Sequence, residues 1–410
     1  MLSNMTKTAK IKQFIANLDG TLRRNRTTLL FIVAFSVLTS WLLVHRLSTL
    51  THGALSAEEW AIATTPIGRH GIAADPYFLI SKLQHSAEVY WFGRATTALT
   101  RLPSVMLGGL SIISLSIVLR FWHGGRIAVL GCLLFAFNAW TLHISRYGGY
   151  ESSYLIVLPL LLLTFIVLER AKQRWVPPVV LLTWGILLYT PGIVWFILLA
   201  VVWQRQELAA AWTRANRWWQ RVVMLVSGLV WLPLLVRHFI KHPETLTRWL
   251  GLPSHYGNLT EFGHRLAAVP VHLFIHGPGI PELWLGRLPI LDVFTLIATL
   301  LGGVYYFRHR ASMRAKLLVI LAIMSVVLIA LGGDTSLSLI VPLLFIFAAA
   351  GVNLLLRDWL SKFPANPVAR FAGVALITLV VLASCTYNWQ QYFIAWPHNT
   401  QNEASYRYRP

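Results

Sequence analysis

Two adjacent glutamates, Glu58 and Glu59, are the most unusual polar feature of this sequence. They follow a long apolar segment, 27–45, in a chain that has only 15 acidic residues. A carboxylate next to an acceptor hydroxyl can act as a general base, which makes the hydroxyl oxygen a stronger nucleophile. The alternative is structural, because acidic residues stabilise the N-terminus of a helix, and a helix is expected to begin near Ser56. No further metal ligands cluster beside the pair, so we expect no metal site and no cofactor.

A second group of candidate residues has the chemistry to bind a phosphate. His143 and Arg146 are three residues apart, which places them on one face of a helix. A guanidinium group matches the geometry of a phosphate, so Arg146 is a candidate ligand for a lipid phosphate. An arginine that extends from a span end toward water is an equally good interpretation. The remaining candidates for carrier-phosphate or substrate binding are Tyr150, Arg248, His255 and Tyr256.

The elements that must position these residues are predicted to be membrane-spanning helices. The chain has 410 residues, of which 56% are hydrophobic, and its apolar runs reach the length needed to cross a bilayer. These features predict an all-α, polytopic integral membrane protein. We expect about eleven transmembrane helices, at approximately 27–45, 102–120, 127–142, 152–168, 175–190, 191–204, 221–236, 288–307, 316–332, 336–356 and 370–387.

Three parts of the chain are expected. Residues 1–26 are basic, with apolar residues at helical spacing, and form either an amphipathic helix on an anionic leaflet or a solvated tail. Residues 27–387 form the transmembrane domain, with long outer loops at 46–101 and 237–287, and 388–410 form a short outer tail. Aromatic and aliphatic residues in the first loop predict helices that lie on the outer leaflet.

The charge distribution predicts the orientation of the chain. The net charge is +20, and most of the 35 lysines and arginines fall in the cytoplasmic loops when the N-terminus is placed inside. We therefore expect a protein of the plasma membrane with its N-terminus in the cytoplasm and its C-terminus outside. Since the charge is mainly a topology signal, nucleic acid is not an expected partner. Most of the acidic residues fall outside, where Glu58 and Glu59 also lie.

Two neighbouring spans are shorter than a bilayer requires. At 1.5 Å per residue, helices at 175–190 and 191–204 would measure about 24 and 21 Å, against a hydrocarbon core of about 30 Å. Because both flanking loops are basic, the pair is expected to cross outward and return. The turn Tyr189–Gly192 would then lie below the outer surface and leave a cavity that opens outward. One long kinked span is the competing interpretation.

Other features limit the possible functions. No acidic residue lies in the middle of an expected span, which argues against an ion-coupled transporter but not against a passive flippase. Cys132 and Cys385 both lie in apolar spans, so no structural disulfide is expected. Asp334 lies in a glycine-rich segment, and we interpret it as a turn residue.

The order of these features resembles the GT-C glycosyltransferases that use polyprenyl-phosphate sugars. The resemblance is strongest to bacterial family-39-type members, relatives of protein O-mannosyltransferases and lipid A aminoarabinose transferases. It covers approximately residues 27–356 and begins with the acidic pair, which is Glu-Glu here and usually Asp-Glu in the family. The other matching segments, in order, are Arg101–Ser104, Asn138–Arg146, Tyr189–Gly192, Gly286–Asp292 and Gly332–Asp334.

The resemblance implies a membrane glycosyltransferase with an outward-facing site. Glu58 would be the general base, Arg146 would lie near the carrier phosphate, and transfer would invert the anomeric carbon without a metal. The expected partners are a polyprenyl-phosphate-linked sugar, membrane lipid, and a glycan, lipid or protein acceptor. Two alternatives stay open: a non-enzymatic lipid-carrier flippase or membrane scaffold, and a ligase or polymerase that uses diphosphate-linked saccharides.

Overall fold

The computed structural model describes residues 26–51, 53–64, 72, 74–93, 96–171, 173–255, 257–283 and 285–408. The predicted amphipathic segment 1–26 therefore lies almost entirely outside the described residues. The chain divides into two compact units, Met1–His45 and Arg46–Pro410. The first contains the described helix α2 (Arg26–Val44), and the second contains all other described elements and all candidate site residues.

The described residues form helices, with no strand among them and one isolated antiparallel bridge between Leu55 and Tyr408. The longer helices of the second unit, with ten or more residues each, are α5 (Leu79–Phe92), α6 (Thr97–His123), α7 (Gly125–Phe137), α9 (Ser152–Arg170), α10 (Val176–Leu187), α11 (Val194–Trp203), α12 (Arg205–Arg214), α13 (Trp218–Leu229), α14 (Leu232–Lys241), α16 (Leu259–Phe274), α17 (Val293–Arg308), α18 (Met313–Leu331), α19 (Val341–Lys362) and α20 (Pro367–Gln390). The shorter elements are α3 (Ala57–Thr64), α8 (Ala139–Ile144), α15 (Thr245–Trp249), α21 (Thr400–Ser405), η1 (Pro281–Leu283), η2 (Leu337–Leu339), η3 (Gln391–Ala395) and η4 (Trp396–His398).

Within the described part of the chain, six helical segments are long and apolar enough to cross a membrane. The bent pair α11 and α12 makes seven if it counts as one span. Four shorter apolar helices lie at Val33–Val44, α7, α10 and α17. Every expected span coincides with one of these helices, but length and composition alone do not confirm the number eleven. The predicted all-α, polytopic membrane class is confirmed.

Close helix contacts are made possible by small residues. A Cβ atom on Gly302 would lie 1.8 Å from the carbonyl oxygen of Phe347, and one on Gly351 would lie 1.9 Å from that of Ala298. No side chain fits at either position, so α17 and α19 pack backbone against backbone. This contact holds the middle of α17 against α19.

A buried polar network then joins the start of α17 to α8. Asp292 caps α17 by accepting a hydrogen bond from the Thr295 N–H at 3.0 Å, and it also accepts one from the Asn388 amide at 3.0 Å. The Asn388 side-chain oxygen accepts from the Ala139 N–H at 3.0 Å, and Asn138 donates to the Ile290 carbonyl at 2.8 Å. The network therefore fixes the segment that carries His143 and Arg146.

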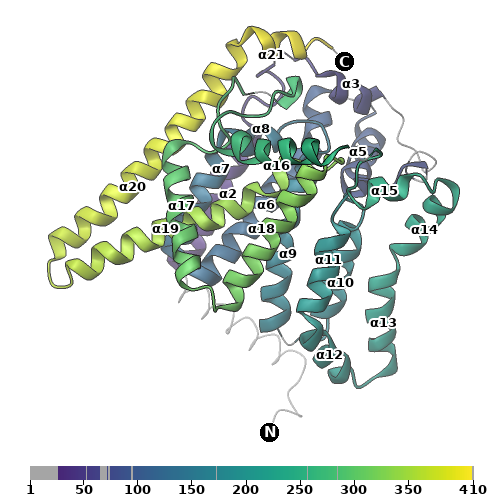
Figure 1. The fold of residues 1–410 in the computed structure, drawn as a ribbon, viewed down its shortest axis with the longest axis horizontal. Coiled ribbons are helices and arrows are strands. Elements are labelled where there is room, and N and C mark those ends of the chain that lie inside the picture. The colour runs from purple at the N-terminus through teal and green to yellow at the C-terminus, as the bar shows by residue number, and fades with distance from the viewer. Residues whose placement is uncertain are drawn as a thin grey trace, which may run out of the picture. The chain divides into compact units, whose positions relative to one another are not determined.

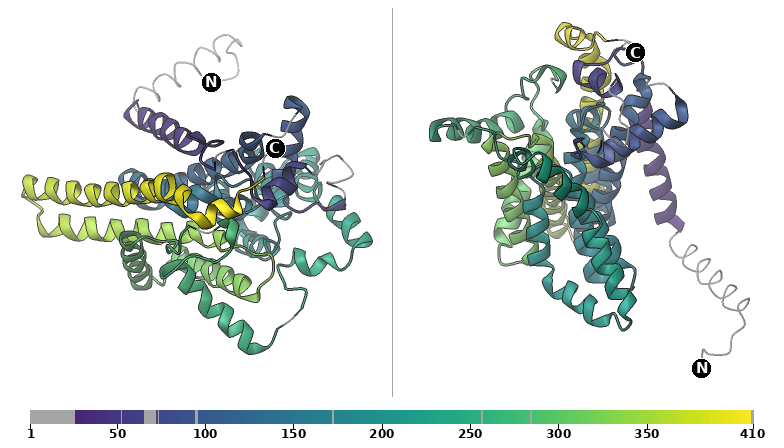
Figure 2. Two further views of the ribbon diagram at one scale, coloured as in Figure 1. Left: turned by 90° about the horizontal axis from the view of Figure 1, so that it is seen from above. Right: turned by 90° about the vertical axis from the view of Figure 1, so that its right-hand side faces the viewer.

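Four helices that carry or adjoin the candidate residues lie toward one end of the second unit. Figure 1 shows α3, α5, α8 and α21 together at the top of the view, above the long helices. In the right panel of Figure 2, α3, α5 and α21 again lie at the same end. The last turn of α5 exposes four consecutive apolar side chains, Val89, Tyr90, Trp91 and Phe92, and Leu83 is exposed as well. Exposed aromatic and aliphatic side chains of this kind suit contact with a membrane surface.

The turn between α10 and α11 is buried beneath both long loops. Its Tyr189 carbonyl accepts a hydrogen bond from the Phe78 N–H at 2.9 Å, in the first loop. The Gly192 N–H donates to the Trp249 carbonyl at 2.9 Å, in the second loop. Gly192 has a φ of 79°, which favours glycine, and a Cβ atom on Gly251 would lie only 2.7 Å from the Gly192 Cα. The turn is therefore hydrogen-bonded to both loops and fixes their backbones next to each other at this point.

Candidate active site

Glu59 is a fully buried member of a capping box. Ser56 precedes α3, and its hydroxyl accepts a hydrogen bond from the Glu59 N–H at 3.2 Å. The Glu59 carboxylate in turn accepts from the Ser56 N–H at 3.0 Å. This reciprocal pattern of a serine and a glutamate three residues apart satisfies two N–H groups at the start of a helix. The structural interpretation of the acidic pair therefore holds for Glu59.

Arg101, at the start of α6, neutralises Glu59. Its Nε lies 2.8 Å from Glu59 Oε1 and its Nη2 lies 3.0 Å from Oε2, so the contact is bidentate. The guanidinium also donates to the carbonyls of Leu47 and Ala54 at 2.9 and 3.1 Å. Burial tends to raise the pKa of Glu59, but the charge and hydrogen bonds of Arg101 outweigh it, and the pKa is lowered. Glu59 is therefore a buried anion whose role is to join α3 to α6.

Glu58 points to the other side of α3 and is exposed. The Tyr147 hydroxyl donates a hydrogen bond of 2.7 Å to Glu58 Oε2, and this hydroxyl also lies 3.2 Å from the Ser56 hydroxyl. Partial burial of the carboxyl group raises the pKa of Glu58, and the nearby charge of Glu282 adds to the increase, against the Tyr147 hydrogen bond. A carboxylate that is accessible and more basic than usual suits general-base chemistry.

The glycine pair after Tyr147 lets the backbone approach both carboxylates. The Gly148 N–H donates to Glu59 Oε1 at 2.8 Å. A Cβ atom on Gly149 would lie 3.0 Å from Glu58 Oε1 and only 2.3 Å from a ring carbon of Tyr147. The turn that follows α8 is therefore shaped to hold the two glutamates, and it needs small residues to do so.

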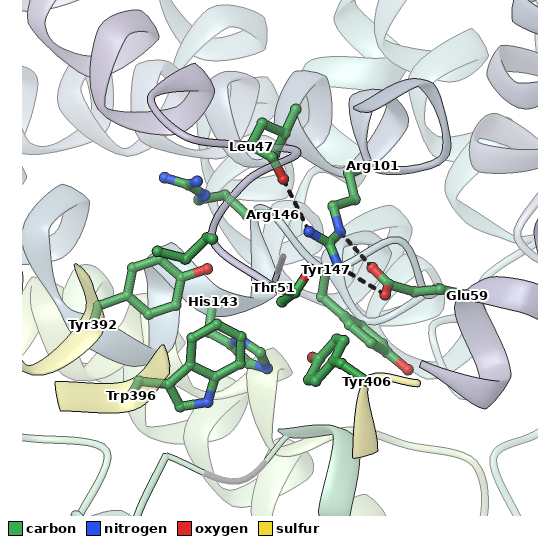
Figure 3. A pocket seen from close by; sticks show the side chains of 11 residues that line it. Leu47, Thr51, Glu59, Arg101, His143, Arg146, Tyr147, Tyr392, Trp396 and Tyr406 are labelled. Atoms are coloured by element: carbon green, nitrogen blue, oxygen red, sulfur yellow. Dashed lines mark hydrogen bonds and ion pairs between the residues drawn. The ribbon is translucent and has the colours of Figure 1, made fainter. Parts of the chain in front are cut away.

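His143 and Arg146 line a small buried pocket with Glu59 and Arg101. The pocket has a free volume of about 10 Å³, room for roughly one water molecule. Figure 3 shows Arg146 on its Tyr392 side and Glu59 on the opposite side. The guanidinium carbon of Arg146 lies 4.8 Å from the centroid of the Phe393 ring and 5.4 Å from that of Tyr392. The pocket is too small for a sugar or a lipid phosphate.

His143 is uncharged at neutral pH. Burial lowers the pKa of its imidazole to about 4. Its Nε2 lies 2.9 Å from the Glu282 carbonyl oxygen, and its ring packs edge-on against Trp396 with 4.9 Å between centroids. A neutral histidine in this position joins α8 to the second loop and to the C-terminal segment. The same carbonyl accepts a hydrogen bond of 3.0 Å from Tyr406.

A second group of charges lies near Tyr150. Arg248 forms an ion pair with Asp334 in which both side chains are almost half exposed, and it also lies over the Tyr77 ring. Lys82 forms a 2.8 Å ion pair with Asp75. Asp334 thus has a charge partner in addition to the turn role expected for it. Its backbone carbonyl also accepts a hydrogen bond from the Tyr154 hydroxyl at 2.7 Å.

Tyr150 connects this group to Glu58. Its backbone N–H opposes part of the rise in the pKa of Glu58, and its ring stacks on Phe78 with centroids 4.8 Å apart. Burial raises the pKa of its hydroxyl to about 12, with further influence from Asp75, Glu58 and Arg248. Burial and the charge of Glu58 also raise the pKa of Glu151 to about 7, against a hydrogen bond from Ser336. The hydroxyl of Tyr150 therefore lies within electrostatic reach of both the proposed base and the exposed arginine.

The structure brings six of the eight candidate residues to one end of the fold. These are Glu58, Glu59, His143, Arg146, Tyr150 and Arg248. His255 is exposed, and the side-chain contact described for it is with Ser254 at 3.3 Å. Tyr256 lies outside the described residues.

Sequence reasoning missed the partners of the pair. Arg101 and Tyr147 are not among the sequence-predicted site residues, although a buried arginine at the start of an apolar helix is a signal for a buried counter-ion. The serine at 56 and the glutamate at 59 also carry a capping-box signature that can be read directly. Among the described residues, no group of three or more histidines, cysteines or acids could hold a metal ion.

Comparisons with known proteins show what this chain resembles. No protein-family model and no curated protein matches the sequence. The fold resembles the apo crystal structure of ArnT from Cupriavidus metallidurans, with a TM-score of 0.52 and 15% identity over 93% of this chain and 77% of ArnT.

Two archaeal structures resemble it to a similar degree. The Archaeoglobus fulgidus oligosaccharyltransferase with zinc and sulfate gives a TM-score of 0.54 and 17% identity over 92% of this chain and 53% of that protein. AglB from Archaeoglobus fulgidus, in complex with an inhibitory peptide and a dolichol-phosphate, gives a TM-score of 0.52 and 14% identity over 92% of this chain and 56% of AglB. This chain thus spans about half the length of the archaeal enzymes. The protein therefore shares the helical fold of ArnT and of the archaeal oligosaccharyltransferase AglB.

Proposed function

We propose that this protein is a membrane glycosyltransferase that moves a sugar from a polyprenyl-phosphate carrier to an acceptor hydroxyl on the outer face of the membrane. The observation that carries the proposal is the accessible Glu58 carboxylate, fixed by Tyr147 and backed by the Glu59–Arg101 ion pair. The shared fold adds support, because AglB with this fold binds a dolichol-phosphate.

In the proposed reaction, Glu58 accepts the proton of the acceptor hydroxyl. The hydroxyl oxygen attacks the anomeric carbon and forms the new glycosidic bond. The bond between that carbon and the carrier phosphate oxygen breaks, and its electron pair leaves with the phosphate. Attack opposite the leaving group inverts the anomeric configuration. The raised pKa of Glu58 favours this role, since a stronger base accepts the proton more readily.

Arg248 is the proposed contact for the carrier phosphate. Its side chain is 43% exposed, and that of its present partner, Asp334, is 49% exposed. A phosphate can exchange with such a carboxylate at low cost, because both charges are already solvated. Lys82 adds positive charge nearby. A cation held in place before the reaction stabilises the charge that develops on the leaving phosphate.

Arg146, His143 and Glu59 are assigned to positioning rather than to direct contact. Arg146 is 3% exposed and is enclosed by Phe393 and Tyr392. Together with the neutral His143 it supports the turn that holds Glu58. In this assignment the sugar and the phosphate remain on the open side of Glu58, and the small pocket beneath stays closed to them.

The test is complementation of a strain that lacks the gene, followed by mass spectrometry of its envelope glycans. Wild-type protein should restore the missing modification. Glu58→Gln removes the base but keeps the shape of the side chain, and it should lower transfer by about 10²–10⁴-fold at unchanged expression. Glu403→Gln is a matched control, since Glu403 is exposed on α21. Full activity in Glu58→Gln would overturn the assignment.

The same experiment separates the alternatives. A flippase or scaffold predicts no dependence on Glu58 and no consumption of lipid-linked sugar by the purified protein. A ligase or polymerase predicts that diphosphate-linked saccharides, rather than monophosphate-linked sugars, are consumed. Metal-independent transfer is part of the proposal, and activity that is lost in EDTA and restored by a divalent cation would contradict it.

A further inference from the structure

A large apolar cavity lies far from the proposed active site. Its volume is about 570 Å³, within the range of roughly 300–1,000 Å³ that is usual for ligand pockets. Gly303 and Phe307 of α17 form one wall, Val319 and Ile320 of α18 form the other, and Phe347 of α19 contributes to the lining. The remaining lining residues include Arg310, in the turn that joins α17 to α18, and Lys316, in the first turn of α18.

The cavity is on a surface that faces lipid. Phe307 is 69% exposed and Val319 is 47% exposed, on helices whose apolar composition suits a bilayer. Gly303 is seven residues before Arg310, so the cavity extends about 10 Å along α17 from the basic turn. An apolar space of this size next to hydrocarbon is filled by acyl chains and not by water.

Positive charge marks the open end of this space. Within the described ranges, neither Arg310 nor Lys316 forms an ion pair with a carboxylate. Arg310 lies over the ring of Phe307 at 5.5 Å, so its cation remains next to the cavity. Basic residues close to a membrane surface attract anionic headgroups. The charge pattern therefore complements a lipid whose headgroup is negative.

We propose that this cavity binds an anionic phospholipid, with one acyl chain between α17 and α18 and the phosphate at Arg310 and Lys316. The cavity is separate from the proposed carrier site. The segment that leads into α17 contacts Asn138 next to α8, and the other end of α17 lies at the cavity. The 16 residues of α17 place these two ends about 24 Å apart. On the orientation predicted from the charges, the basic turn faces the cytoplasm, where anionic lipids are abundant.

Two adjacent glycines allow a sharp test of the acyl-chain contact. Gly302 packs against the Phe347 backbone and accepts no side chain, whereas a Cβ on Gly303 meets open space. Gly303→Leu should fill the cavity without disturbing the α17–α19 contact. Gly228→Leu is the matched control, since a Cβ on this α13 glycine also meets open space. The charge contact is tested by the double variant Arg310→Gln/Lys316→Gln, with Lys362→Gln/Arg370→Gln as its control.

The experiment uses the full chain in phosphatidylcholine nanodiscs with a trace of photo-crosslinkable phosphatidylglycerol, and maps the labelled peptides by mass spectrometry. Labelling is expected at α17 and α18. The double charge variant should lower it by about tenfold or more, while crosslinkable phosphatidylcholine labels both proteins equally and weakly. Gly303→Leu should exclude both lipids, and the two controls should behave as wild type at matched thermal stability.

Three results would overturn the proposal. Equal labelling of the wild type by the two phospholipids would show a cavity that does not select charge. Unchanged phosphatidylglycerol labelling in the double variant would remove Arg310 and Lys316 from the site. Displacement of phosphatidylglycerol by an equal amount of undecaprenyl phosphate would identify a carrier lipid as the occupant instead.

Discussion

Replacement of Glu59 by glutamine should destabilise the protein far more than replacement of Glu58. The Glu59 side chain is 0% exposed and accepts four hydrogen bonds of 2.8–3.0 Å, from the Arg101 Nε and Nη2 and from the N–H groups of Ser56 and Gly148. In a glutamine, an NH₂ group replaces one carboxylate oxygen, so it faces N–H donors to which it cannot bond. The substitution also leaves the Arg101 charge buried without its counter-ion. Breaking a buried ion pair on one side costs about 3–5 kcal/mol.

The assay is the free energy of unfolding in mixed micelles, measured by titration with a denaturing detergent, alongside the envelope-glycan assay. The free energy of unfolding of Glu58→Gln should lie within roughly 0.5 kcal/mol of the wild-type value, because the Glu58 side chain is exposed. The double variant Glu59→Gln/Arg101→Gln should recover part of the loss, since it removes the buried charge as well. Recovery is incomplete because the carbonyls of Leu47 and Ala54 lose their donor.

The result that refutes this reasoning is a Glu59→Gln protein that is as stable as wild type but inactive. Glu59 would then act in the reaction itself, and the assignment of separate roles to the two glutamates would be wrong. The pH dependence gives a second check. The pKa of Glu59 is lower in the folded protein, so the stability that it contributes is present above its ordinary pKa of 4.5 and is lost as the pH falls through the folded value.

Three further substitutions test the geometry around Glu58. Tyr147→Phe removes a hydrogen bond that lowers the pKa of Glu58, so this pKa should rise. Activity falls as Glu58 is protonated, and the acidic limb of the pH–rate profile should therefore move to higher pH. An unmoved limb would contradict the role of Glu58 as the base. Gly149→Ala should lower transfer roughly tenfold or more by displacing Tyr147 and Glu58, and Gly125→Ala, in open space, is its control in the same glycan assay. Arg248→Gln should weaken carrier binding by roughly 10–100-fold, seen as a raised KM with purified protein, while Arg237→Gln should not.

The membrane class could be predicted from the sequence because it depends on local composition. Hydrophobic runs identify spans without any knowledge of their neighbours, and the short lengths of 175–190 and 191–204 correctly indicated the unusual pair α10 and α11. The covering of the Tyr189–Gly192 turn could not be predicted. It depends on Phe78 and Trp249, which lie more than a hundred residues apart and meet only in the folded chain.

The candidate site shows the same limit. Glu58 and Glu59 stand out because acids are rare here, but their different roles depend on Arg101 and Tyr147, which are 42 and 89 residues away. His143 and Arg146 were expected on one helical face, yet α8 ends at Ile144, before Arg146. They line one pocket because the chain turns at this point, with the Arg146 N–H bonded to the His143 carbonyl at 3.0 Å.

The two neighbouring glutamates can do different work because successive residues on a helix point about 100° apart. Glu59 therefore faces the core, where it needs a counter-ion, and Glu58 faces outward, where it can reach a substrate. Arg101 keeps Glu59 ionised and in place, and Glu59 in turn holds the Gly148 backbone that orients Tyr147 and Gly149. The position and basicity of Glu58 are thus set by a buried pair that need not touch the substrate. A neutral residue at 59 would disturb the base indirectly, by loosening the turn, and this is why stability and activity must be measured together.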